Sequence, residues 1–276
     1  MKNITRTLFA ILLTGLFYNA DAQYGYGFGY GPPPRHRQEQ SKPEEKDSGP
    51  AKPTGYFELS IGLATPTGSF ASPVGLSYNG KYALPGLAFN ASAGIPIAHT
   101  NIGIALMYGY YNNPFDINSY VNNVQFSDQT KSYSPITQDS YVENFVMAGL
   151  FWTWPIERFS FDARFMGGIA VCNLPEIYYG ADYAYGPYGS GYYEYTWDYA
   201  PSSSIAFAFD IGGDARYKLR RSSIMFGVDY IHASTNANTT LNYTDANGIN
   251  WPYNVHSGVS IANLTFTLGV GYQIGK

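Results

Sequence analysis

Apolar and polar residues alternate with a period of two along most of the chain after Gly55, most clearly between Ser203 and His232. This period places alternate side chains on opposite faces of a β-strand. A short basic segment, Lys218–Arg221, divides the stretch and predicts a β-hairpin. One face of the hairpin carries bulky apolar groups, and the other carries glycine, alanine and aspartate. The bulky face consists of Ile205, Phe207, Phe209, Ile211, Ile224, Phe226, Val228 and Tyr230.

Eight segments show this alternation, and most have at least the roughly 9–11 residues that a tilted strand needs to cross a membrane. They are Gly55–Ala64, Gly86–Ile97, Asn101–Tyr111, Ser140–Trp154, Phe159–Val171, Ser203–Tyr217, Ser222–His232 and Gly258–Ile274. The connections alternate between short (Ala98–Thr100, Pro155–Arg158, Lys218–Arg221) and long (Thr65–Pro85, Asn112–Asp139, Cys172–Ser202, Ala233–Ser257). Outer-membrane barrels have short periplasmic turns and long extracellular loops. The sequence therefore predicts an all-β fold, an eight-stranded antiparallel up-and-down transmembrane β-barrel.

The two faces of the predicted strands differ in a way that favours lipid outside the barrel. A soluble lipocalin-like barrel, the alternative, would turn its large side chains inward and its charges outward. Here the charged residues share a face with glycines, opposite the aromatic residues. In the segment 140–154, Trp152 and Trp154 suit an outward aromatic girdle, which turns Glu143, Phe145 and Phe151 inward.

Composition agrees with a membrane barrel. Only 13% of the 276 residues are charged and 17% are aromatic, whereas soluble domains contain roughly 25% charged residues. The net charge of −4 and the short basic clusters do not indicate binding to nucleic acid. The sequence indicates no cofactor and no metal site.

The N-terminal region predicts export. Lys2 and Arg6 precede a short apolar core, and Ala20-Asp21-Ala22 provides a cleavage site, so residues 1–22 are expected to be a signal peptide. Residues 23–54 are rich in glycine, tyrosine and proline and then in charge, which predicts a disordered periplasmic linker. Residues 55–276 are expected to form the barrel.

The arrangement resembles the small eight-stranded outer-membrane barrels of Gram-negative bacteria, including the OmpA-like barrel and OmpX. The last strand contains Gly269-x-x-Tyr272-x-Ile274, which is similar to the C-terminal insertion signal of that family, although Gly275-Lys276 replaces the usual terminal phenylalanine. Gln23 after Ala22 resembles exported Bacteroidetes proteins. The resemblance implies an outer-membrane location with both termini in the periplasm, contact with outer-membrane lipid, and assembly by the barrel-insertion machinery.

The predicted lumen carries charges that must pair with one another or form hydrogen bonds. We interpret them as a plug of salt bridges about the two arginines; a proton or ion path is the alternative. Eight strands leave little free lumen, so a narrow pore for small solutes is a further alternative rather than the leading one. The residues are Glu58, Asp162, Arg164, Asp210, Asp214, Arg216 and Asp229.

One candidate catalytic group is His232 and Ser234 with Asp245 further on. Serine, histidine and a carboxylate can form an acyl-transfer site. The pattern is similar to the lipid A deacylases of the outer membrane, but Thr235 stands where that family has asparagine, and its acid is glutamate. The alternative reading is a girdle histidine followed by a polar loop, and no enzyme activity is favoured.

The segment Ile177–Tyr199 contains nine tyrosines and a tryptophan without any Lys or Arg. Such a loop either packs on itself or binds a sugar, protein or host ligand, because tyrosine offers rigid amphipathic contact area. The acids Asp182, Glu194 and Asp198 match no known calcium loop. The candidate binding surface is Tyr178, Tyr179, Tyr183, Tyr185, Tyr192, Tyr193, Tyr195 and Trp197.

The leading expectation for function is a structural or binding role, in envelope integrity, adhesion or as an accessory of a secretion apparatus. The partner would be a periplasmic or extracellular protein or glycan. The two alternatives are a lipid A acyl hydrolase and the narrow pore.

Overall fold

The computed structural model describes residues 55–71, 81–98, 100–128, 131–137, 139–183, 195–219 and 221–274. Every described residue belongs to one compact unit, residues 49–276. The expected signal peptide and linker lie outside the described residues, so both stay predictions.

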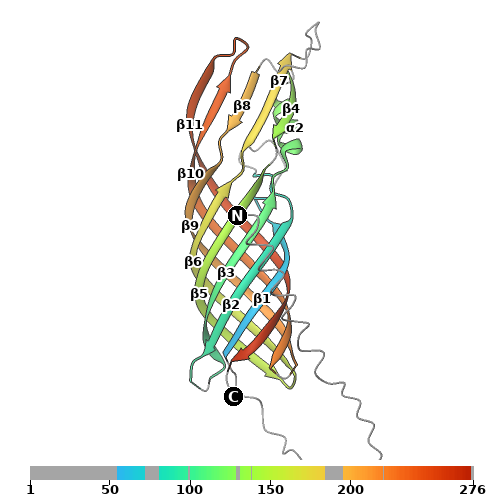
Figure 1. The fold of residues 1–276 in the computed structure, drawn as a ribbon, viewed down its shortest axis with the longest axis vertical. Helices are drawn as coiled ribbons and strands as arrows, with labels where there is room; N and C mark the ends of the chain where they lie inside the picture. The colour runs from blue at the N-terminus through green and yellow to red at the C-terminus, as the bar shows by residue number, and fades with distance from the viewer. Residues whose placement is uncertain are drawn as a thin grey trace, which may run out of the picture. The chain divides into compact units, whose positions relative to one another are not determined.

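Eight antiparallel strands form a closed ring in the order β1-β2-β3-β5-β6-β9-β10-β11, and β11 pairs with β1 to close it (Figure 1). At the closure Gly55 lies opposite Ile274, so the first and last strands meet at the same end of the barrel. The predicted fold class is confirmed. The strands are β1 (Gly55–Pro66), β2 (Gly86–Pro96), β3 (Ile102–Pro114), β5 (Ser140–Ile156), β6 (Phe159–Leu174), β9 (Ser202–Leu219), β10 (Ser222–Thr244) and β11 (Asn250–Ile274).

The bulky side chains of these strands point away from the barrel axis, as predicted. Phe207 is 72% exposed and Trp154 is 63% exposed, whereas Ala208 and Phe145 are fully buried. The outward positions of the described barrel strands between the two barrel ends carry no Asp, Glu, Lys or Arg. An uncharged apolar wall with tryptophan and tyrosine at its edges is the surface that lipid requires. The barrel is therefore of the transmembrane kind.

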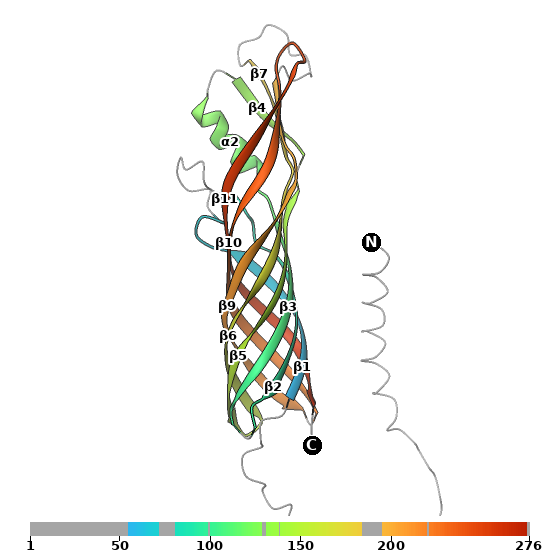
Figure 2. The same cartoon turned by 90° about the vertical axis from the view of Figure 1, so that its left-hand side faces the viewer.

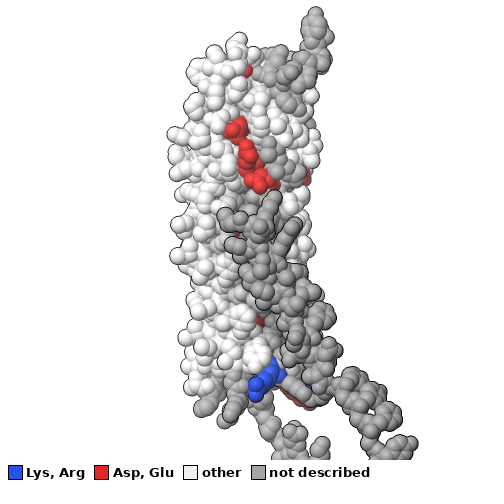
Figure 3. Space-filling model, in the orientation of Figure 1, with Lys and Arg blue, Asp and Glu red and all other residues white. Residues whose placement is uncertain are grey.

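Few charged side chains can be seen on the surface in Figure 3, and the two signs lie in different parts of it. The visible Lys and Arg side chains lie near the end that carries Gly55 and Ile274, and most visible Asp and Glu side chains lie toward the opposite end. No helix in the described part of the chain is long and apolar enough to cross a membrane.

Beyond the apolar wall, at the end remote from Gly55 and Ile274, the chain builds further structure that we call the head (Figure 2). It comprises α2 (Ile117–Ser127), β4 (Lys131–Thr137), β7 (Ile177–Tyr183), β8 (Tyr195–Tyr199) and the parts of β10 and β11 between His232 and Ala262. β8 pairs with Leu241–Thr244 of β10, β7 pairs with β8, and β4 pairs with β7.

The head corrects part of the sequence interpretation. The alternation predicts a long loop over Ala233–Ser257, but β10 runs on to Thr244 and β11 begins at Asn250, so most of this segment is a strand hairpin. The predicted loop 112–139 contains α2 and β4, and the predicted loop 172–202 contains β7 and β8. These segments lack the apolar outward row of a membrane strand, because they lie outside the lipid and need no such row.

β4 is the outermost strand of the head sheet, and α2 protects its free edge. The Gln125 side chain donates to the carbonyl oxygen of Lys131 (2.6 Å) and accepts from the backbone N–H of Tyr133 (2.8 Å). It thus occupies the hydrogen-bonding positions that an added strand would use. Asp116 caps the first turn of α2 by accepting from the Ser119 N–H at 3.0 Å, which fixes the helix start beside β3.

Candidate functional site

Arg164 is the centre of the lumen network. Its guanidinium contacts the carboxylates of Asp210 (3.5 Å, from Nε), Asp214 and Asp229, and all four side chains are at least 95% buried. Arginine can bind three acids at once because its planar guanidinium carries five N–H donors, whereas the lysine ammonium carries only three.

Arg216 forms the second half of the network, nearer the barrel termini. Its guanidinium contacts Glu58 and Asp162, each at 2.5 Å, and its Nη2 lies 3.8 Å from Asp214, which links the two halves. The Tyr56 ring lies 4.1 Å from the Arg216 guanidinium carbon, close enough for a cation–π contact. The predicted lumen residues are therefore brought together, around the two arginines that the sequence analysis selected.

Two glycines make the network possible. A Cβ added at Gly212 would lie 1.7 Å from Asp229 Oδ1, and one added at Gly227 would lie 2.5 Å from Asp214 Oδ1. The small residues opposite the aromatic face thus leave room for the carboxylates that bind Arg164.

Toward the head the lumen holds mainly aromatic and aliphatic side chains, together with the buried Glu143, which accepts from the Asn263 side chain at 3.4 Å. Tyr111 and Phe145 pack with ring centroids 5.1 Å apart, and Ile231, Val259 and Ile261 are almost fully buried beside them. At the opposite end, the pocket beside Arg216 has a volume of only 20 Å³, which is about one water molecule. Described side chains therefore occupy the lumen from the charged network up to the head.

A cavity of about 420 Å³ lies in the head, above this packing. Its described lining comes mainly from α2, β5, β7, β8, β10, β11 and the segment that precedes β2. It includes five tyrosines, one lysine and no acid: Tyr82, Tyr120, Tyr141, Tyr179, Tyr199 and Lys81. The volume lies in the lower part of the range typical of small-molecule sites, roughly 300–1,000 Å³.

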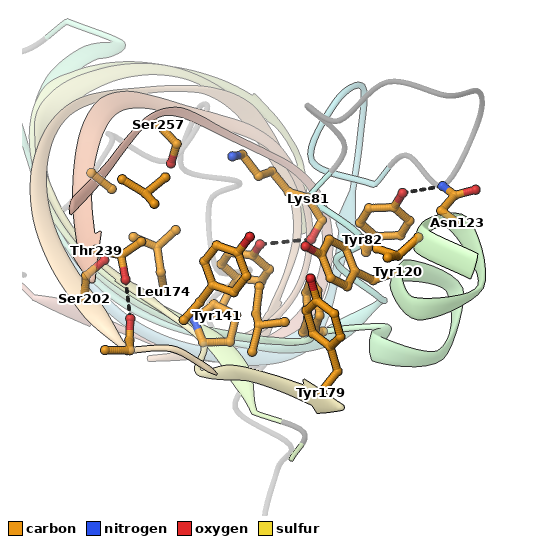
Figure 4. Close-up of a pocket in the computed structure, with 18 of the residues that line it drawn as sticks. Lys81, Tyr82, Tyr120, Asn123, Tyr141, Leu174, Tyr179, Ser202, Thr239 and Ser257 are labelled. Carbon is orange, nitrogen blue, oxygen red and sulfur yellow. Dashed lines mark hydrogen bonds between the residues drawn. The ribbon is translucent and has the colours of Figure 1, made fainter. Parts of the chain in front are cut away.

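Figure 4 shows how these side chains are arranged. Lys81 extends across the mouth of the barrel toward Ser257, whereas Tyr82, Tyr120 and Tyr179 gather on the side of α2. The rings of Tyr82 and Tyr120 meet edge to face at 5.5 Å, and those of Tyr120 and Tyr179 at 5.7 Å. Asn123 of α2 donates to the Tyr82 hydroxyl, so the helix holds this aromatic wall in place.

The candidate tyrosine surface is divided by the structure. Tyr179 is buried and lines the cavity, and its ring stacks on Trp197 at 5.2 Å. The Trp197 ring also contacts the Tyr243 ring (centroids 5.4 Å apart), and Tyr243 stacks on Tyr195 (6.3 Å). Tyr178 is partly buried in β7 and Tyr183 ends that strand. Tyr185, Tyr192 and Tyr193 lie outside the described residues, as does Glu194, while Asp198 accepts from Asn242 at 3.3 Å.

The candidate catalytic residues do not come together. His232 and Ser234 share the outward face of β10, and the His232 ring packs on Phe209 at 5.2 Å. Asp245 lies at the tip of the β10–β11 hairpin, where it accepts from the backbone N–H groups of Asn247 (2.9 Å) and Ile249 (3.0 Å). Because strand connects position 232 to position 244, the rise of about 3.3 Å per residue separates Asp245 from His232 by roughly 40 Å.

Sequence reasoning missed most of the cavity. Most of its residues come from segments that were interpreted as separate loops, whereas Tyr141 belongs to a predicted strand. Only Tyr179 belonged to the candidate surface. One signal was available: Lys81 is the only Asp, Glu, Lys or Arg between Glu58 and Asp116.

No family model and no curated protein matches the chain. Similar solved structures include Neisserial surface protein A (13% identity, TM-score 0.43), which covers 80% of this chain and 97% of that one. A major outer membrane protein of Thermus thermophilus (12%, TM-score 0.42) covers 80% and 99%. Ail, the attachment invasion locus protein of Yersinia pestis (11%, TM-score 0.37), also covers 80% and 99%.

These organisms give no support to the Bacteroidetes origin that Gln23 indicates. At such identities and TM-scores the likeness carries no argument about ligand or partner. The assignment to eight-stranded antiparallel transmembrane barrels therefore rests on this chain's own ring of strands and its apolar outer wall.

Proposed function

We propose that this protein is a binding protein of the outer membrane, in which a filled barrel anchors a ligand-binding head at the cell surface. The observation that carries the proposal is the tyrosine-lined cavity of about 420 Å³ at the mouth of the barrel. A barrel that served only as an anchor would need no such space above its packed interior.

Orientation follows from the lengths of the connections. The barrel termini and the short turns share one end, and the head lies at the other. Outer-membrane barrels keep their short turns in the periplasm. On this basis both termini are periplasmic and the cavity opens on the extracellular side.

The interior argues for binding rather than for passage of solutes. Arg164 and Arg216 tie together carboxylates from β1, β6, β9 and β10, and the aromatic and aliphatic packing below the cavity separates this network from the head. Lipid hydrolysis has less support, because Asp245 lies far from His232 and Ser234 along β10.

The test uses a matched pair of substitutions on β10. Ala237 lines the cavity and is 2% exposed, whereas Asn238 is an exposed residue on the other face of the same strand. Ala237→Phe should fill the space and abolish binding of small molecules to the full chain in lipid nanodiscs, measured by saturation-transfer NMR. Asn238→Phe should leave binding intact. Equal binding by both variants would show that the cavity is not the site.

A further inference from the structure

Lys81 is an unusual residue to find in this cavity. It is partly buried, and the described residues offer it no ion pair, since no carboxylate oxygen among them lies within 4.0 Å of its Nζ. Burial lowers the pKa of the Lys81 ammonium, and no charge among the described residues offsets that effect. The Lys81 side chain lines the cavity, so its ammonium is available to pair with an anion that enters.

The backbone holds Lys81 in place. Its N–H donates to the Ser69 carbonyl (3.0 Å), and its own carbonyl accepts from the Tyr141 hydroxyl (2.9 Å). The next residue, Tyr82, has φ of 51° although it is not a glycine. This left-handed conformation costs roughly 1–2 kcal/mol. Strain of this kind persists where the surroundings over-determine it, often at ligand clamps.

A second lysine of the head shows what a satisfied side chain looks like there. Lys131 pairs with Asp128 at 3.5 Å, and its ammonium lies 4.9 Å from the centre of the Tyr195 ring. Lys131 does not line the cavity. The two lysines of the head therefore differ in their surroundings: Lys131 has a carboxylate partner, whereas Lys81 faces the cavity.

The remaining lining defines the rest of the ligand. Phe115, Leu174 and Val255 offer apolar contact, and the tyrosine rings add flat surfaces with hydroxyl groups. The lining contains no acid in the described part of the chain, so nothing there would repel an anion or favour a cation. Such a site suits a small molecule with an apolar or aromatic body and one negative charge.

We propose that the head cavity binds a small amphipathic carboxylate, with the Lys81 ammonium paired to the carboxylate and the apolar body packed against the tyrosine rings. This inference rests on the proposed function and names the class of its ligand. The ligand supplies the negative charge that the described residues do not offer to Lys81.

The experiment uses a panel of aryl- and alkyl-carboxylates, each with its matched primary amide, titrated into the full chain in zwitterionic lipid nanodiscs. A charge-assisted hydrogen bond contributes roughly 1.5–3 kcal/mol, which corresponds to about ten- to hundredfold in affinity. Acids should therefore bind at least tenfold more tightly than their amides. Lys81→Met should remove that preference, Lys81→Arg should retain part of it, and Lys131→Met should not change it.

Each outcome decides a different question. If acids and amides bind alike and Ala237→Phe abolishes both, the cavity is a binding site but the anionic ligand is wrong. If no member of the panel binds the wild-type protein, the proposed function and this inference both fail. If Lys131→Met removes the preference as fully as Lys81→Met does, the charge acts at long range and Lys81 is not the contact.

Discussion

Removal of the Arg164 guanidinium should be the most damaging single change in the barrel. Arg164→Ala leaves Asp210, Asp214 and Asp229 without their shared partner, and the side chains of these acids are no more than 1% exposed. The network as built contains two arginines and five acids that contact them. If all are ionised the sum is −3, and the substitution makes it −4 with one base remaining.

Breaking a buried ion pair by removing one partner destabilises a protein by roughly 3–5 kcal/mol. Arg164 has three such partners, so we expect a loss of at least about 4 kcal/mol in the free energy of unfolding. The stability of Arg164→Lys should lie between those of Arg164→Ala and the wild type, because one ammonium cannot satisfy three acids in a plane. Arg158→Ala, in an exposed turn at the same barrel, should change stability by less than about 0.5 kcal/mol.

The assay is equilibrium urea unfolding in lipid vesicles, followed by tryptophan fluorescence and by the gel mobility of the folded barrel. A double-mutant cycle of Arg164→Met with Asp229→Asn should show coupling of roughly 0.5–3 kcal/mol, because the two side chains share a contact. If the free energy of unfolding of Arg164→Ala lies within about 1 kcal/mol of the wild-type value, the network does not hold the barrel together. Its interpretation as a structural plug is then refuted.

Four other predictions address the head and the functional alternatives. Lys81→Met should be more stable than the wild type at neutral pH. This gain in stability should shrink as the pH rises from the lowered pKa of Lys81 to the ordinary pKa of lysine. In that pH window the lysine of the unfolded chain still binds a proton, whereas the lysine of the folded chain has lost it. A gain that grows with pH in urea titrations would contradict this. Gln125→Ala should speed amide exchange at Tyr133 by freeing the β4 edge, whereas Asn122→Ala, exposed on the same helix, should not. Asn247→Cys, at the tip of the β10–β11 hairpin, should react with an impermeant maleimide on intact cells, while buried Cys172 in the parent should not; if the introduced thiol reacts only after the outer membrane is opened, the proposed orientation is reversed. Expression of the protein should leave lipid A acylation unchanged by mass spectrometry, and planar bilayers should show no openings of porin size.

The barrel could be predicted from sequence because lipid imposes a simple rule on each strand. An outward row such as Ile102, Ile104 and Leu106 must be apolar, and the inward row must be small or polar in so narrow a lumen. The same rule identified the inward arginines and acids, although not which acid contacts which arginine. Those contacts depend on strand stagger, which brings Asp162 of β6 opposite Asp214 of β9 and was not specified by the alternation alone.

The head was not predicted because its strands lack the alternating apolar outward row that identified the barrel strands. Its cavity is assembled from short segments far apart in the chain, and tyrosine can serve in a core, a surface or a site. The one sequence signal, an isolated lysine in an otherwise uncharged stretch, gains meaning only when Tyr141 and Ser69 are seen to fix its backbone.

β10 contains both patterns, that of a barrel strand and that of the head, in a single strand. Its outward row begins with Ile224, Phe226 and Val228 and changes after Tyr230 to polar residues. Its inward row changes in the opposite sense, from Ser223 and Asp229 to Ile231, Ala233 and Ala237. The register with β11 stays unbroken across this change, so the two faces exchange character within one continuous strand pair. The apolar outward row of β10 thus ends at Tyr230, and Ala237, which lines the cavity with Lys81, lies beyond that point in the head.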